Sequence, residues 1–157
     1  MSILRILDKL DDFLANIAIA AIMIITVIAV FMRYIANDPL QWIEEVLIAL
    51  FIWAIMLGAA SAMKNRQHVS IDAFTVLMPA KVQYAIRIIN HLIMISVLSV
   101  FGVLGMQLAI EAQDKITPIL SIKYMYIDIA VPIGAFWMVL HVMRHLYKDI
   151  KTGNKEQ

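Results

Sequence analysis

The amino-acid sequence predicts an all-α integral membrane protein with four transmembrane helices, and two observations support this fold class. Hydrophobic residues make up 62% of the 157 residues, whereas soluble domains contain about 45–50% apolar residues. Asp, Glu, Lys and Arg are absent from four long stretches, residues 13–32, 46–63, 88–110 and 129–142. A helix that crosses a bilayer needs about 20 mostly apolar residues. We therefore expect one membrane domain, 1–157, with helices at about 13–35, 39–63, 80–111 and 123–147 and a loose tail at 148–157.

Two further segments are amphipathic and are expected to lie along the membrane surface. Residues 1–14, MSILRILDKLDDFL, repeat aliphatic side chains at helical spacing, with charged side chains elsewhere on the helical wheel. This N-terminal segment is expected to turn into the first membrane helix. Between the second and third helices, Ile71, Phe74, Leu77 and Met78 form an apolar side. They predict a short in-plane cytoplasmic helix, which Pro79 ends.

The basic residues predict the orientation in the membrane. If both termini are cytoplasmic, ten of the 13 Lys and Arg residues lie on the cytoplasmic side, which leaves Arg33, Lys115 and Lys123 outside. Cytoplasmic loops carry an excess of Lys and Arg. We therefore expect a multi-pass membrane protein with both termini in the cytoplasm.

The residues ANDPLQ, 36–41, predict a tight turn between the first two helices. Asp38 is expected to cap the second helix, Pro39 suits the first helical position, and Gln41 completes a capping box. The two helices should then form an antiparallel hairpin.

Two adjacent carboxylates, Glu44 and Glu45, stand at the start of this second helix, close to Trp42. The hairpin brings Arg33 to a similar depth, so Arg33 is expected to pair with one of them. Neighbouring helical residues point about 100° apart, which leaves the other carboxylate for water, Gln41 or another protein. A proton or cation relay is the alternative, and the shallow position of the glutamates favours a structural ion pair.

Small residues predict two close-packing ridges. Residues four apart in the second helix lie on one ridge and allow helix backbones to approach closely: Ala54, Gly58 and Ala62. A similar strip is expected in the third helix: Ser99, Gly102 and Gly105. In the fourth helix, Pro132 predicts a kink.

The sequence gives little support to an enzyme. There is no cysteine, and hydrolase, zinc-protease and phosphate-loop motifs are absent. His91 and His141 share a depth, as two axial haem ligands do, so a haem- or quinone-binding anchor of an oxidoreductase is an alternative. A four-helix multidrug exporter is another, but the centre of the first helix has no carboxylate.

The segment from Arg33 to Pro79 resembles the small membrane subunit of tripartite ATP-independent periplasmic (TRAP) transporters, the DctQ family. The resemblance rests on Arg33 before the turn, Trp42 two residues before the paired glutamates, Gly58, and a H-[VI]-x-[VI]-D motif that runs from His68 to Asp72. The stretch HVSIDAFTVLMPAKV is most similar to the sialic-acid (SiaQ-type) members.

The resemblance implies a non-catalytic subunit of a sodium-driven secondary transporter for organic acids, with sialic acid as one possible substrate. It implies a location in the bacterial inner membrane and a large membrane subunit that carries the substrate and sodium sites. It also implies a periplasmic substrate-binding protein that docks on the complex. No cofactor is expected in this subunit, and its expected contacts are these proteins and membrane lipids, without nucleic acid. Residues expected at structural or interface positions are Arg33, Trp42, Glu44, Glu45, Gly58, His68 and Asp72.

Overall fold

The described residues form long helices. The computed structural model describes residues 2–64 and 79–153. They contain five helices: α1 (Ser2–Tyr34), α2 (Trp42–Lys64), α4 (Ala80–Glu111), α5 (Met125–Asp128) and α6 (Ala130–Gly153). Between α4 and α5, Ile116 and Lys123 form an isolated antiparallel bridge. The in-plane helix expected before Pro79, with His68 and Asp72, lies outside the described residues.

Four segments are long and apolar enough to cross a membrane: Asp12–Tyr34, Trp42–Lys64, Val82–Glu111 and Met125–Lys151. The apolar 18-residue stretches within them have mean hydropathies of 2.7, 2.4, 2.2 and 1.6, in chain order. The predicted all-α class and the four helices of membrane-crossing length are therefore confirmed by length and composition.

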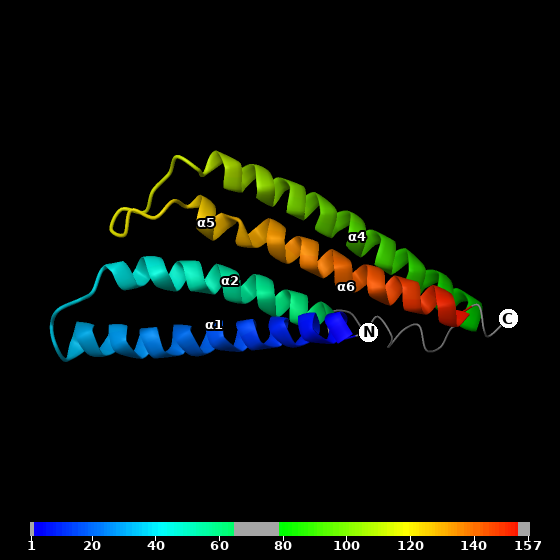
Figure 1. Ribbon diagram of the computed structural model, residues 1–157, viewed down its shortest axis with the longest axis horizontal. Coiled ribbons are helices and arrows are strands. Elements are labelled where there is room, and N and C mark those ends of the chain that lie inside the picture. Colours follow the sequence, from blue (N-terminus) through cyan, green and yellow to red (C-terminus); the bar gives the residue numbers. More distant parts are fainter. Residues whose placement is uncertain (1, 65–78, 154–157) are drawn as a thin grey trace.

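The helices lie side by side in one layer, in the order α1, α2, α6 and α4 (Figure 1). The extensive helix–helix contacts join α1 to α2, α2 to α6, and α6 to α4. The first residues of α1 and the last residues of α6 lie at one end of the layer, which we call the terminal end (Figure 1). The turn between α1 and α2 and the connection between α4 and α5 lie at the opposite end, which we call the loop end.

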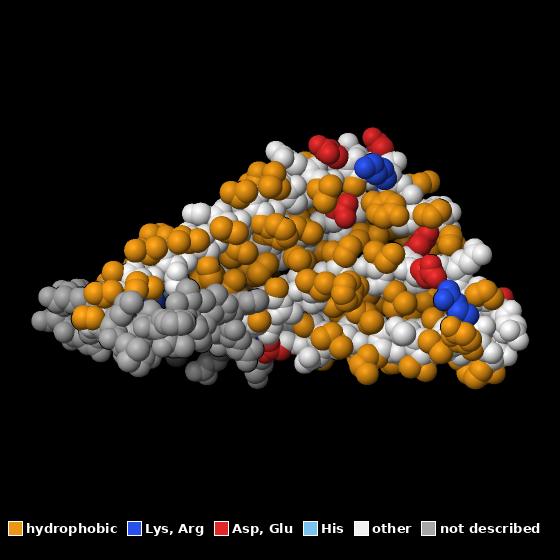
Figure 2. Space-filling model, turned by 180° about the vertical axis from the view of Figure 1, so that it is seen from behind, with side chains coloured by type: hydrophobic (Ala, Val, Ile, Leu, Met, Phe, Trp, Pro, Cys, Tyr) orange, Lys and Arg blue, Asp and Glu red, His pale blue; other side chains and the backbone are white. Residues whose placement is uncertain are grey.

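This layer leaves broad apolar surfaces uncovered. In the apolar 18-residue stretches of α1, α2 and α4, only 11% of the residues are buried. In the corresponding stretch of the span that contains α6, 44% are buried. Hydrophobic side chains cover much of the face in Figure 2, and the coloured charges there lie mostly toward the loop end. A surface of this kind requires lipid or another protein around it.

The first helix differs from the prediction. Residues 1–14 were expected to lie in the membrane plane and then turn, but α1 is one uninterrupted helix from Ser2 to Tyr34. Figure 1 shows no bend along it. The segment contains neither Gly nor Pro, which are the usual causes of a sharp bend in a helix.

The turn after α1 is longer than expected. The prediction placed Asp38 at the helix cap and Pro39 at the first helical position, but α2 begins only at Trp42. Asn37 has a positive φ of 53°, a conformation that Asn tolerates and that commonly ends helices. The Asp38 N–H then donates to the carbonyl of Met32, at 3.1 Å. The Asp38 amide therefore completes the end of α1 instead of starting α2.

The fourth span is interrupted at Ile129, between α5 and α6. Proline lacks an N–H and its ring crowds the carbonyl four residues earlier. For Pro132 this carbonyl belongs to Asp128, the last residue of α5. The expected distortion therefore lies three residues before the proline. The tail expected to be loose from residue 148 is helical as far as Gly153.

Glycines allow α4 to pack closely on α6. A Cβ at Gly102 would lie 3.3 Å from the Cβ of Ala135, and one at Gly105 would lie 2.6 Å from Cγ1 of Val131. The close-packing strip predicted in the third helix is confirmed at these two glycines.

A third close approach was not predicted. A Cβ at Gly134 of α6 would lie 2.7 Å from the Cβ of Met56 in α2. Glycines therefore allow α6 to pack closely on both of its neighbours, α4 and α2.

Candidate functional site

Arg33 and Glu44 join the two helices of the first hairpin at the loop end. Nη2 of Arg33 lies 3.0 Å from Oε1 of Glu44. The structure thus assigns Glu44, and not Glu45, to the ion pair that the sequence predicted across the hairpin. Both side chains are well exposed, at 58% and 70%. Exposed pairs contribute only about 0–1 kcal/mol to stability.

Glu45 makes a different set of contacts, with the connection between α4 and α5. Its Oε1 accepts a hydrogen bond from the N–H of Ile119 at 2.8 Å, and its Oε2 accepts one from the N–H of Leu120 at 2.9 Å. The carboxylate left over by Arg33 was expected to face water, Gln41 or another protein, and it is instead used within the chain.

The local sequence explains why two amides are available to Glu45. Pro118 has no N–H, and it starts the turn that contains Ile119 and Leu120. The N–H groups at the beginning of such a turn have no partner within it, as at a helix N-terminus. A side-chain oxygen normally accepts from them. Here Glu45 supplies both oxygens from another helix, and hydrogen bonds to a charged acceptor are stronger than neutral ones.

The rest of this connection is closed by its own backbone. The N–H of Thr117 donates to the carbonyl of Ile122 at 2.8 Å, and the N–H of Tyr124 donates to that of Lys115 at 3.0 Å. The N–H of Ile122 donates to the Thr117 hydroxyl at 3.1 Å. Thr117 is 2% exposed and lies at the centre of these contacts. We call residues 112–124 the outer loop.

Two tryptophans of α2 lie at its loop end and near its middle. Trp42 is the first residue of α2 and is 42% exposed. The Nε1–H of Trp53 donates to the carbonyl of Tyr126 in α5 at 3.3 Å. Glu45, near the start of α2, therefore ties this helix to the outer loop, and Trp53, near its middle, ties it to α5.

Gly58 was predicted to lie on a ridge that packs closely against another helix, either of this chain or of a partner. A Cβ at Gly58 would meet no atom within 4 Å, so Gly58 makes no close helix contact within the described chain. Ala54 on the same ridge is 7% exposed. The expected ridge of small residues thus brings no helix of this chain close at Gly58.

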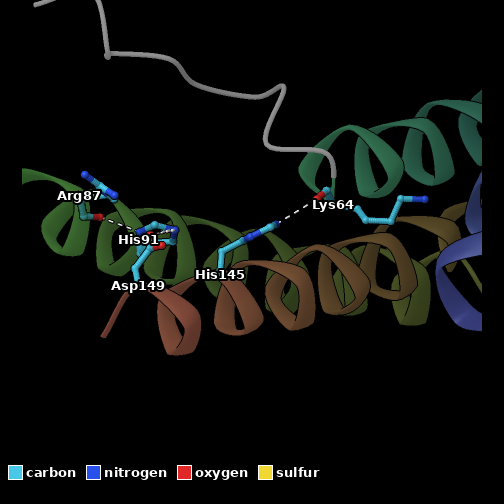
Figure 3. Close-up of polar contacts among 5 residues, drawn as sticks. All are labelled: Lys64, Arg87, His91, His145 and Asp149. Carbon is cyan, nitrogen blue, oxygen red and sulfur yellow. Dashed lines mark hydrogen bonds and ion pairs between the residues drawn. The ribbon is translucent and has the colours of Figure 1, made fainter. Parts of the chain in front are cut away.

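The terminal end holds His91 and His145, together with an aspartate that sequence reasoning missed. Nδ1 of His91 lies 2.7 Å from the carbonyl of Arg87, and its Nε2 lies 3.9 Å from Oδ2 of Asp149. The side chains of His91 and Asp149 are 12% and 8% exposed. Figure 3 shows His91 between Arg87 and Asp149, with His145 reaching toward Lys64. The ring nitrogens of His91 thus have protein partners, and this geometry does not favour the haem hypothesis.

A second polar cluster lies where α1 meets the end of α2. Nζ of Lys64 lies 2.7 Å from Oδ2 of Asp12, and the Ser61 hydroxyl donates to Oδ1 of the same carboxylate. Sequence reasoning missed this cluster because it assigned Asp12 to a surface segment.

These sites hold helices together and show no catalytic arrangement. Among residues 2–64 and 79–153, no group of three or more His, Asp or Glu side chains is placed to hold a metal ion. The ion pairs between described residues lie toward the two ends of the layer, and the central parts of the spans carry no charge. Of the predicted site residues, Arg33, Glu44, Glu45 and Trp42 gather at the loop end, and Gly58 lies apart from them.

Comparisons with known proteins agree with this architecture. Residues 22–152 match the family described as tripartite ATP-independent periplasmic transporters, DctQ component. The chain is 27% identical over 150 residues to the sialic acid TRAP transporter permease protein SiaT of Haemophilus influenzae, which covers 96% of this chain and 24% of SiaT. It is 23% identical over 147 residues to the sialic acid TRAP transporter small permease protein SiaQ of Vibrio cholerae, covering 94% of this chain and 85% of SiaQ.

A third relative has a different substrate in its name. The chain is 28% identical over 97 residues to the C4-dicarboxylate TRAP transporter small permease protein DctQ of Vibrio cholerae, covering 60% of this chain and 42% of that protein. The chain thus spans about a quarter of SiaT and less than half of this relative. Because the family match extends over most of its length, the chain belongs to the DctQ component family of tripartite ATP-independent periplasmic transporters.

Proposed function

We propose that this chain is the small membrane subunit of a sodium-driven TRAP transporter that takes up an organic acid. As a TRAP permease component it is not an enzyme. The proposal assigns the substrate and sodium sites to a large membrane subunit. This chain packs against the scaffold of that subunit and helps a periplasmic substrate-binding protein to dock. Sialic acid is the first substrate to test, because SiaQ and SiaT carry it in their names.

One structural observation supports assigning transport to the large subunit and a supporting role to this chain. The helices form a single layer with its broad faces uncovered (Figure 1). A transport pathway needs polar groups at the membrane midplane, enclosed by protein. The central parts of the four spans have no charged residues. A layer of this kind is suited to support another membrane protein, and we place Gly58 on a surface available to that partner.

We further propose that both termini are cytoplasmic and that the loop end faces the periplasm. The distribution of Lys and Arg supports this orientation. Reporter fusions after Gln157 should report the cytoplasm, and a fusion at Asn37 should report the periplasm. A periplasmic C-terminus would contradict the orientation.

Reconstitution tests the transport function. Liposomes that contain both membrane subunits, with the binding protein outside and an inward sodium gradient, should accumulate radiolabelled sialic acid or, if the substrate is a dicarboxylate, succinate. Liposomes that contain only this chain should accumulate neither. Uptake by this chain alone would show that it has a transport pathway of its own.

A further inference from the structure

The two adjacent glutamates make different contacts, and those of Glu45 order a loop that could bind a partner protein. Glu44 pairs with Arg33 within the first hairpin. Glu45 reaches across to the amides of Ile119 and Leu120, 74 and 75 positions later. The shape of the outer loop therefore depends on a side chain from α2.

The backbone of the outer loop is hydrogen-bonded within the chain, and part of the exposed surface of the loop is apolar. Its backbone amides at Thr117, Ile119, Leu120 and Ile122 are all used in hydrogen bonds within the chain. Aliphatic side chains of the same short segment are exposed by 57%, 46%, 36% and 43%: Ile116, Ile119, Leu120 and Ile122. A surface whose backbone is already ordered loses little conformational entropy when it binds a partner.

The position of the loop argues for a partner in the periplasm. The loop lies at the loop end, beyond the last residue of the α4 span, Glu111. Asp114, Lys115 and Lys123 lie within the loop, and charges of this density are costly to bury in hydrocarbon. A membrane-embedded partner would cover the sides of the helices, whereas a soluble partner reaches the ends of the layer. In a tripartite periplasmic transporter, the soluble partner is the substrate-binding protein.

We propose that the outer loop, residues 112–124, is a preformed docking surface for the periplasmic substrate-binding protein, and that Glu45 is the residue that positions it. This inference rests on the proposed function and orientation. Glu45 acts through the loop backbone and is a positioning residue, while Ile119 and Leu120 supply part of the contact surface.

The test compares Glu45→Ala with Glu44→Ala in the complete transporter, reconstituted in nanodiscs. The binding protein is saturated with whichever of sialic acid and succinate supports wild-type uptake, and its affinity is measured by biolayer interferometry. Glu45→Ala should weaken binding about tenfold, as expected for the loss of a well-ordered contact surface. Glu44→Ala, the matched control, should change the affinity less than about twofold.

A second variant removes apolar side chains from the proposed contact surface and keeps the two hydrogen bonds between Glu45 and the loop. Ile119→Ser with Leu120→Ser keeps both backbone amides that Glu45 binds, and it should also weaken binding about tenfold. Hydrogen exchange adds a readout that is independent of the partner. In nanodiscs without binding protein, the amides of Ile119 and Leu120 should exchange faster in Glu45→Ala and at the wild-type rate in Glu44→Ala.

The outcomes separate the two proposals. If the wild-type complex transports but Glu45→Ala and the double serine variant both bind the substrate-binding protein normally, the docking inference is wrong and the proposed function stands. If the double serine variant instead loses the large subunit during purification, the loop contacts that subunit and the inference is also wrong. If the wild-type complex neither binds the substrate-binding protein nor transports, the proposed function itself fails.

Discussion

Nε2 of His145 in α6 lies 3.0 Å from the carbonyl oxygen of Lys64, the last residue of α2. A carbonyl only accepts hydrogen bonds, so the Nε2 of His145 carries the hydrogen in this contact. The last four carbonyls of a helix have no partner within it. His145 therefore completes the end of α2 from a neighbouring helix, at the terminal end of the layer (Figure 3).

Replacing His145 should weaken the contact between α2 and α6. His145→Ala should lower the free energy of unfolding by about 0.5–1.5 kcal/mol, the usual contribution of one hydrogen bond. His145→Gln keeps a side-chain donor and should recover part of the loss. Tyr147→Ala, at a side chain that is 68% exposed, is the control on the same helix. Thermal unfolding of the purified chain in detergent measures the differences, and an unchanged melting temperature for His145→Ala would contradict the cap.

The contact between His91 and Asp149 should appear as an energetic coupling between α4 and α6. Both side chains are largely buried and lie 3.9 Å apart. Residues in direct contact typically show coupling energies of about 0.5–3 kcal/mol. A double-mutant cycle with His91→Ala and Asp149→Ala, followed by thermal unfolding in detergent, should therefore give non-additive losses. Ile150→Ala, at a residue that is 49% exposed, replaces Asp149→Ala in the control cycle. Additive losses for the His91 and Asp149 variants would show that the two residues do not support each other.

Gly134 and Gly58 should respond in opposite ways to the same substitution. A Cβ at Gly134 would lie 2.7 Å from Met56 Cβ, while one at Gly58 would meet nothing within 4 Å. Overpacking commonly costs about 1–3 kcal/mol, so Gly134→Ala should destabilise the isolated chain. Gly58→Ala should leave its stability unchanged or slightly higher, because alanine is favoured over glycine in helices. Equal melting temperatures for the two variants would contradict the tight contact at Gly134.

Gly58→Leu tests whether Gly58 contacts the large subunit in the assembled complex. If Gly58 faces the large subunit, as proposed, the leucine should reduce co-purification of that subunit although the isolated chain stays stable. Co-purification equal to that of the wild type would remove Gly58 from the proposed interface.

The long apolar segments were predictable because the bilayer imposes a strong constraint on composition and length. The four spans and the hairpin contact of Arg33 follow from that constraint. The arrangement of the helices in one layer does not, because lipid tails satisfy an apolar helix face as well as another helix does. Gly134 shows this well: it is followed by alanine in an apolar helix, as Gly58 is, and the packing of α6 on α2 gives it a close neighbour that Gly58 lacks.

Polar contacts between distant segments were also hidden from sequence reasoning. Thr117 followed by Pro118 is a usable signal for a turn with free amides, but nothing in that signal identifies Glu45 as the acceptor. Asp38 shows the reverse difficulty. Its sequence context matches a helix cap, yet the left-handed conformation of Asn37 shifts the start of α2 to Trp42.

The pair of Arg33 and Glu44 should contribute little to stability, although it was the contact most readily predicted. Its side chains are 58% and 70% exposed, so Arg33→Ala should cost less than about 1 kcal/mol. The charge-reversed double variant, Arg33→Glu with Glu44→Arg, should unfold within a few tenths of a kcal/mol of the wild type, because an exposed pair depends mainly on its opposite charges. Thermal unfolding in detergent at low and at about 1 M salt measures this, since salt screens exposed charges over about 3 Å at that concentration. The small loss in Arg33→Ala should disappear at high salt. A loss of several kcal/mol that persists in salt would show that the pair is shielded from water.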